Sequence, residues 1–298
     1  MYNIDMADNY YPKIGLALGS GGAKGLAHIG VLKNLETYNI PIHAIAGASI
    51  GSLIGAYYAA HPDIPKLEEL IRNFDQRKGF LLFDPILRGG LIKGNKIEKF
   101  IAEMVTVSDF SELKIPFAAV ATDFNTAEKV ILNKGNLVKA IRASISVPAI
   151  FQPIWYQDRL LADGGLSDPI PTEVVRDMGC DIVLAVNVEN LYLQNPILRS
   201  LPLTKVPMHS MDILRHNLNS LSTYPADLVI SPKIPPVGLV GWNYFFDTQK
   251  SQRMIKAGED AMQQAIEPLQ KLILSKQTEY KQTHGIRKYF TFVKRLLK

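Results

Sequence analysis

The sequence predicts an α/β fold built on a mostly parallel sheet. Within the first 60 of the 298 residues, short apolar runs alternate with segments of helical periodicity. Residues 14–18 and 41–46 are apolar runs of strand length, and each precedes a helical segment, at 24–38 and 52–60. The first helical segment repeats its apolar residues every three positions, at Leu26, Ile29, Leu32 and Leu35. Strand, helix, strand, helix is the order that parallel α/β layering requires.

The later elements continue this mixed pattern. Further strands are predicted at residues 116–122, 129–132, 160–162, 182–187 and 228–230, and further helices at 64–74, 96–105, 136–143, 208–222 and 248–274. Residues 191–207 are rich in Pro and Leu and show no period. Residues 80–95 also lack a period, so they form either a lid over a site or an ordered surface loop, which is the commoner use of such a segment.

Composition indicates one globular domain over residues 1–275. Apolar residues make up 47% of the chain and charged residues 20%, as in ordinary globular proteins. Cys180 is the single cysteine, so no internal disulfide forms, and residues 1–12 lack the pattern of a signal peptide. Residues 40–60 contain no Asp, Glu, Lys or Arg, but their proline and three glycines favour a buried strand and helix over a membrane span. We therefore expect a cytoplasmic protein.

The positive charge is concentrated at the C-terminus. The net charge is +5, yet residues 276–298 alone carry +6, from seven Lys or Arg and one Glu. A helix over the last residues would place Ile286, Phe290, Val293 and Leu297 on one face. Such a basic amphipathic tail either binds an anionic membrane surface, peripherally at the inner face, or packs on its own body or on a second subunit of a homo-oligomer. Nucleic acid is a weaker alternative, because no nucleic-acid-binding motif accompanies the charge.

A candidate nucleophile lies between the second strand and the second helix. Residues 47–51 fit the pattern G-x-S-x-G, with Gly47 and Gly51 on either side of Ser49. A serine on a sharp strand-to-helix turn is held exposed, and the N-terminal end of the following helix favours negative charge on its oxygen. The alternative is a tight Gly/Ser turn without chemistry, but the strand-turn-helix context favours the nucleophile.

A serine nucleophile needs a base, and Asp163 is the best candidate. It ends a short strand and precedes Gly164 and Gly165, which leave room for another backbone or a substrate. Burial beside Ser49 would raise its pKa from about 3.9 toward the range of a useful base. A plain Asp-Gly turn is the alternative. The six histidines suit a triad less well, since none after Ser49 lies in a glycine-rich turn at a strand end.

The glycine-rich loop at residues 19–25 suits an oxyanion hole. Consecutive glycines at the start of a helix present backbone N–H groups to an oxygen that gains negative charge. A dinucleotide site is disfavoured, because its G-x-G-x-x-G pattern would need glycine where Lys24 stands. The phosphate-binding pattern G-x-x-x-x-G-K-[ST] is also missing from the sequence.

Together, residues 21–25 (GGAKG), 47–51 (GASIG) and 163–165 (DGG) resemble the patatin-like phospholipase family in order and spacing, over about residues 14–176. The resemblance implies a three-layer α/β/α fold and a Ser49–Asp163 dyad that works without histidine. It also implies an oxyanion hole at Gly21 and Gly22, with Lys24 beside it and Gly25 completing the motif. Ser20 stands where many members carry a further glycine.

The same resemblance implies a serine acyl hydrolase that cleaves fatty-acyl esters of phospholipids or lysophospholipids, with no metal or cofactor. Two alternatives stay open. One is an acyltransferase or thioesterase that uses the same dyad. The other is a membrane-surface regulatory protein with little turnover, which the intact motifs disfavour.

Overall fold

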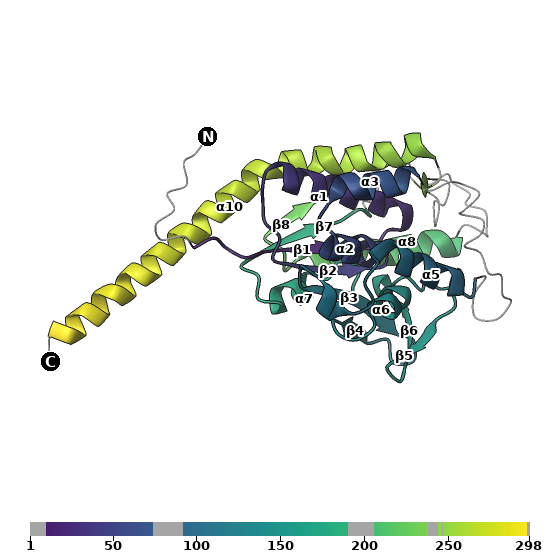
Figure 1. The fold of residues 1–298 in the computed structure, drawn as a ribbon, viewed down its shortest axis with the longest axis horizontal. Coiled ribbons are helices and arrows are strands. Elements are labelled where there is room, and N and C mark those ends of the chain that lie inside the picture. Colours follow the sequence, from purple (N-terminus) through teal and green to yellow (C-terminus); the bar gives the residue numbers. More distant parts are fainter. Residues whose placement is uncertain are drawn as a thin grey trace.

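The computed structural model describes residues 10–73, 92–189, 206–235, 237, 244–245 and 247–296. Its centre is an eight-stranded sheet of order β5-β6-β3-β2-β1-β7-β8, with β4 paired to β3 (Figure 1). The strands are β1 (Ile14–Leu18), β2 (Ala44–Ala48), β3 (Phe117–Asp123), β4 (Lys129–Leu132), β5 (Ile154–Tyr156), β6 (Arg159–Asp163), β7 (Ile182–Val186) and β8 (Leu228–Ile230). Strands β3, β2, β1, β7 and β8 run parallel, while β4, β6 and β5 add an antiparallel end.

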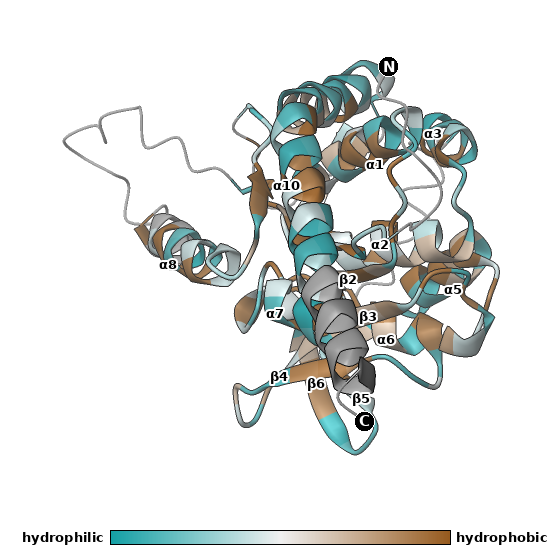
Figure 2. Cartoon of the chain, turned by 90° about the vertical axis from the view of Figure 1, so that its left-hand side faces the viewer, coloured by the Kyte–Doolittle hydropathy of each residue, from teal (hydrophilic) through white to brown (hydrophobic). Residues whose placement is uncertain are grey.

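Helices cover both faces of this sheet. They are α1 (Ala27–Thr37), α2 (Ile50–Ala60), α3 (Ile64–Arg72), α5 (Asn95–Val105), α6 (Leu137–Ser144), α7 (Thr172–Asp177), α8 (Val206–Thr223) and α10 (Thr248–Leu296). Three short 3-10 turns complete the described elements: η1 (Gly22–Leu26), η2 (Phe110–Glu112) and η3 (Gly164–Leu166). Figure 2 shows α7 and α8 on one side of the sheet and α2 and α5 on the other.

Alternation along the strands explains the three layers. In β1, Leu16 and Leu18 join the large core that α1, α2, α5, α6 and α10 share, whereas Ala17 faces α7. In β2, Ile45 lies in the large core and Ala46 in the smaller one. Both faces are buried, which is why these strands are apolar throughout. The predicted three-layer α/β/α fold is confirmed.

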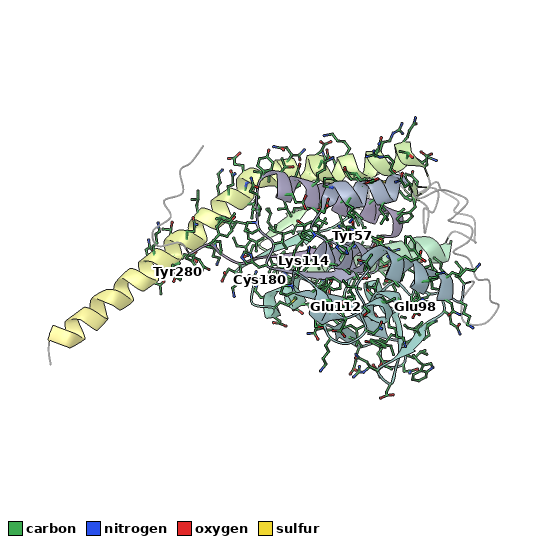
Figure 3. The ribbon with its side chains drawn as sticks, viewed as in Figure 1. Tyr57, Glu98, Glu112, Lys114, Cys180 and Tyr280 are labelled. Carbon is green, nitrogen blue, oxygen red and sulfur yellow. The ribbon has the colours of Figure 1, made fainter. Side chains whose placement is uncertain are left out.

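Helix α10 is much longer than predicted. Its first part packs tightly on α1, because a Cβ on Gly30 would lie 1.9 Å from the Ile255 carbonyl oxygen, and one on Gly258 would lie 1.9 Å from that of Ala27. The helix contains Pro268, changes direction part-way and leaves the body (Figure 1). Tyr280, labelled on the protruding part in Figure 3, stacks on Tyr10 with ring centroids 4.0 Å apart.

Residues 276–296 therefore continue a helix that was predicted to end at residue 274. The side chains beyond residue 283 lie outside the described part, so the amphipathic tail stays a prediction.

Most predicted elements are present, with shifted ends. Strand β5 and helix α7 were not predicted, because they have only three and six residues and so show no usable period. The aperiodic segments at 80–95 and 191–207 fall largely outside the described residues, so the choice between lid and surface loop is untested. None of the described helices has the length and apolarity that a membrane span needs.

Candidate functional site

Strand register brings Ser49 and Asp163 together, although 114 positions separate them. Ala48, the last residue of β2, pairs with Val120 of β3, and the next residue of β3, Ala121, pairs with Asp163 at the end of β6. Ser49 and Asp163 therefore lie at the same level of the sheet on either side of β3. Because β6 runs antiparallel to β3, its carboxyl end meets the serine turn.

The turn at Ser49 is strained and tightly packed. Ser49 has φ of 53° and ψ of −126°, a left-handed conformation that non-glycine residues rarely adopt. A Cβ on Gly47 would lie 2.4 Å from the carbonyl oxygen of Gly51, and one on Gly51 would lie 2.1 Å from that of Leu18. Both glycines are needed for this close approach. Helix α2 starts directly after Ser49, so its positive end lies at the serine oxygen.

The two side chains form a short hydrogen bond. Ser49 Oγ donates to Asp163 Oδ2 at 2.6 Å, while Asp163 Oδ1 accepts from the Gly165 N–H at 2.8 Å. Both residues are buried. Burial raises the pKa of Asp163 to about 6, and the hydrogen bonds from Ser49 and Gly165 and the charge of Arg215 limit this rise. A carboxylate with such a pKa is a competent general base at neutral pH.

Two serines that sequence reasoning missed hold the dyad in place. Ser144 Oγ accepts the Ser49 N–H at 3.0 Å and donates to the Val120 carbonyl at 2.6 Å. The Ser146 carbonyl accepts the Asp163 N–H at 3.0 Å. The side chain of Ser146 in turn accepts a 2.6 Å hydrogen bond from the buried Arg142 guanidinium. Two serines at the end of a helix were the available signal, but serines are too common for sequence alone to single them out.

The glycine loop is held between strand ends. The Gly19 N–H donates to Val186 and the Ser20 N–H to Pro169, at 3.1 and 2.8 Å. His28 Nε2 lies 2.8 Å from the Gly19 carbonyl, and burial lowers the pKa of His28 to about 4, so the neutral ring is the donor. This histidine supports the loop rather than the dyad.

The three residues expected at the oxyanion hole occupy different positions. Gly22 lines a pocket together with Ser49. Gly21 lies against Val188 and Glu189. The Lys24 N–H donates to the Gly21 carbonyl, and its ammonium lies 3.9 Å from Glu189. The nearby motif residue Gly25 packs on Ile50, with no room for a Cβ. Of these residues, Gly22 lines the pocket with Ser49, whereas Gly21 and the Lys24 ammonium both face Glu189.

An ionic cluster around the buried Glu189 adjoins Asp163. The Glu189 carboxylate, just after β7, pairs with Arg215 and lies 3.4 Å from the Asn219 amide, both on α8. It also faces Lys24. The positive charge of Arg215 acts on Asp163, and burial lowers the pKa of Arg215. Sequence reasoning missed Arg215 and Glu189, since neither belongs to a motif.

An apolar pocket of about 120 Å³ opens beside Ser49. Its walls come mainly from α2, α5 and the residues after α6, and its lining consists of Gly22, Ser49, Ile50, Leu53, Ile54, Ile71, Ile97, Phe100, Ile101, Met104, Ile145, Val147, Phe151 and Phe245. Apart from Ser49, no lining residue has a polar side chain. The pocket therefore suits a hydrocarbon chain whose end reaches the serine.

In the described part of the chain, no histidine hydrogen-bonds to Ser49 or Asp163, and no three His, Cys, Asp or Glu side chains gather as metal ligands would. Cys180 is buried beside α7, and burial raises the pKa of its thiol.

This chain is similar to known proteins over part of its length. An uncharacterized NTE family protein of Mycobacterium bovis is 38% identical over 178 residues, which cover 59% of this chain and 49% of that protein. Lysophospholipase NTE1 of Pyricularia oryzae is 31% identical over 182 residues, covering 60% of this chain and 12% of that protein. Patatin-like phospholipase domain-containing protein 6 of Mus musculus is 31% identical over 182 residues, covering 59% of this chain and 13% of that protein. The matched regions thus span half or less of these relatives.

Among solved structures, VipD from Legionella pneumophila aligns with a TM-score of 0.45 and 12% identity, covering 87% of this chain and 67% of that chain. The type III effector protein ExoU aligns with a TM-score of 0.43 and 16% identity, covering 84% of this chain and 54% of that chain. The sequence model of the patatin-like phospholipase family matches residues 16–176, more than half of the 298 residues and all three motifs. The chain therefore belongs to the patatin-like phospholipase family.

Proposed function

We propose that this protein is a serine hydrolase of fatty-acyl esters, with Ser49 as nucleophile and Asp163 as general base. The observation that carries the proposal is the 2.6 Å hydrogen bond from Ser49 Oγ to Asp163 Oδ2 at the mouth of an apolar pocket. The bond supplies an activated hydroxyl, and the pocket supplies a place for an acyl chain next to it.

In the first half of the reaction, Asp163 Oδ2 takes the proton of Ser49 Oγ as that oxygen attacks the ester carbonyl carbon. The carbonyl oxygen becomes negative, and the N–H groups of Gly21 and Gly22 are the proposed donors to it. Collapse breaks the bond to the leaving alcohol, which takes the proton from Asp163. The product is an ester of the fatty acid with Ser49.

In the second half, Asp163 takes a proton from water, and the resulting hydroxide attacks the acyl-enzyme carbonyl. The C–O bond to Ser49 breaks, Ser49 Oγ recovers the proton from Asp163, and the fatty acid leaves. The ionic cluster assists each time Asp163 is protonated. Asp163 and Glu189 balance Arg215 and Lys24 at rest, so neutralising Asp163 leaves an excess positive charge that favours the new oxyanion.

The substrate class follows from the pocket and the relatives. A pocket of about 120 Å³, apolar apart from Ser49, suits one acyl chain. Two of the matched relatives carry the names lysophospholipase and patatin-like phospholipase. We therefore propose lysophospholipids and phospholipids as substrates, with single-chain lysophospholipids preferred.

The basic C-terminal segment supports work at a membrane surface. Residues 276–298 carry +6, and α10 projects their helical part beyond the body (Figure 1). Each Lys or Arg near an anionic bilayer contributes about 1 kcal/mol of attraction. This segment is proposed to hold the enzyme at anionic lipid.

The test is release of free fatty acid from phospholipids, lysophospholipids and p-nitrophenyl esters of graded chain length. The wild type is compared with Ser49→Ala and Asp163→Asn, and a fluorophosphonate probe reports the reactive serine independently of substrate. We expect release and labelling by the wild type and loss of at least a thousandfold in turnover in both variants.

Failure of the probe to label Ser49 in a folded protein would refute any serine enzyme here. Labelling without release from any ester would refute hydrolysis and favour transfer of the acyl group to another acceptor.

A further inference from the structure

Among the described side chains of helix α8, several apolar ones face solvent, while Arg215 and Asn219 face the protein. Ile213, Leu214 and Leu221 expose 43%, 63% and 71% of their surface, and Val206 is similarly exposed. Tyr224, directly after the helix, is 90% exposed. These positions form one face at the helical period of 3.6 residues. The same face includes the exposed and uncharged Ser210, Asn217 and Ser220. We call this face, Val206, Ile213, Leu214, Leu221 and Tyr224, the α8 apolar face.

The opposite face of α8 carries the polar contacts. Arg215 and Asn219, one turn apart, both reach the buried Glu189, and the Ser222 carbonyl accepts a hydrogen bond from Thr172. A surface helix normally turns its apolar stripe inward. Here Arg215 and Asn219 direct their side chains inward to Glu189, and the described apolar face lies on the outside.

This arrangement has an energetic cost in water. Together the five side chains expose on the order of 500 Å² of apolar surface, which is within the range of the largest patch on a typical monomer, and such a patch is often functional. It is short of the ~800 Å² per partner that a stable protein interface buries. A second copy of the chain is therefore a poor occupant, whereas a lipid surface needs no such minimum area.

The chemistry of the face also suits lipid. In the described side chains of the face there is no charge, and a tyrosine stands at its end, as is common where a protein meets a membrane interface. Figure 2 shows α8 at the periphery of the molecule, away from α10. The helix also connects directly to the dyad, because Arg215 acts on Asp163 from its inner face.

We propose that the α8 apolar face docks on the apolar surface of a lipid aggregate and delivers the enzyme to its substrate there. This inference rests on the proposed function. Docking buries the five side chains among acyl chains while the inward contacts of Arg215 and Asn219 to Glu189 stay intact. The contribution is hydrophobic, so it persists at high salt, unlike attraction through the basic segment 276–298.

The test measures binding separately from catalysis. Ser49→Ala protein is floated with neutral phosphatidylcholine vesicles at 1 M salt, alone and with Leu214→Ser, Leu221→Ser and Tyr224→Ser combined. The matched control combines Trp155→Ser and Leu274→Ser, whose side chains are 69% and 62% exposed on other elements. We expect the α8 variant to lose at least tenfold in vesicle partitioning and the control to lose less than twofold.

A second measurement keeps the face apolar. Leu221→Trp should show a blue-shifted emission on adding vesicles and quenching by a bilayer-embedded quencher, while Leu274→Trp should show neither. Equal loss of binding in the α8 variant and the control would overturn the proposal. A lipid-free dimer that the α8 substitutions dissociate would also overturn it, in favour of a subunit interface.

Catalysis separates this proposal from the one it rests on. With Ser49 restored, the α8 variant should hydrolyse a dissolved short-chain ester as the wild type does and vesicle lipid at least tenfold more slowly. Vesicle binding by a wild type that hydrolyses nothing would refute the hydrolase and leave docking in place. If the α8 variant hydrolyses both dissolved and vesicle esters as fast as the wild type does, docking alone is refuted.

Discussion

Ser144 holds the backbone of Ser49, the proposed nucleophile: its Oγ accepts the Ser49 N–H at 3.0 Å and donates to the Val120 carbonyl at 2.6 Å. The hydroxyl thereby ties the serine turn to the strand that separates it from Asp163. It also holds the N–H of a residue whose backbone is strained and whose Oγ donates to the carboxylate.

Replacing Ser144 should therefore impair turnover more than folding. Ser144→Ala removes the acceptor of the Ser49 N–H, so the dyad distance is less well held. We expect kcat/KM to fall at least tenfold, and the free energy of unfolding to fall by about 1–3 kcal/mol for the unpaired buried groups. The measurements are ester kinetics and thermal unfolding, with the exposed Ser111→Ala as the matched control. An unchanged kcat/KM in a destabilised variant would show that Ser144 serves only the fold.

The pH dependence of the reaction should report Asp163. The base must be deprotonated to act, and its pKa is raised to about 6, so kcat/KM should rise with pH and level off above about 7. Arg215 lowers that pKa, so removing its charge should move the acid limb to higher pH. The variant pairs Arg215→Gln with Glu189→Gln, so that no lone carboxylate stays buried. If the acid limb of the pH profile stays in place, Arg215 does not set the pKa of Asp163.

Two buried groups should give opposite pH dependences of stability. The pKa of Asp163 is raised from 3.8 to about 6, so its contribution to stability is greatest below 3.8 and is lost as pH rises through 6. The pKa of His28 is lowered from 6.5 to about 4, so its contribution is greatest above 6.5 and is lost as pH falls toward 4. Each contribution is at most about 3 kcal/mol.

Variants separate these two contributions. Relative to wild type, Asp163→Asn should gain unfolding free energy as pH rises from 4 to 6. His28→Gln should gain unfolding free energy as pH falls from 6.5 to 4, because glutamine does not titrate in this range. Glutamine also keeps a donor for the Gly19 carbonyl. Denaturant unfolding across this range measures both differences. Two flat difference curves would mean that neither group is as strongly buried as the structure indicates.

The apolar pocket should set the preferred acyl length. Leu53 lies one turn after Ser49 on a wall of the pocket and is only half-buried, so Leu53→Trp should fill the pocket without preventing folding. We expect activity on long-chain esters to fall at least tenfold more than activity on acetate or butyrate esters. Met104→Ala should shift the preference toward longer chains. The control is Leu272→Trp, half-buried on α10 outside the pocket, and an equal loss on all chain lengths would refute the assignment.

Much of the architecture was predictable because it depends on local patterns. The apolar runs at β1, β2, β3, β7 and β8 are long enough to be recognised, and their alternation with helices requires a parallel sheet. Strand β5 and helix α7 were missed because segments this short show no periodicity. Helix α10 was predicted too short, since residues after 274 turn polar and its stacking contact between Tyr10 and Tyr280 joins opposite ends of the chain.

The sequence by itself determined the family, the fold class and the candidate residues Ser49, Asp163 and Gly22, because glycine-flanked turns can be recognised from a few consecutive residues. Only the tertiary structure decided that Ser49 Oγ and Asp163 Oδ2 lie 2.6 Å apart, since strand register across β3 sets that distance. It also revealed Ser144, the Glu189–Arg215 pair and the outward apolar face of α8. Their roles come from contacts between residues far apart in the chain, and no local pattern encodes such contacts.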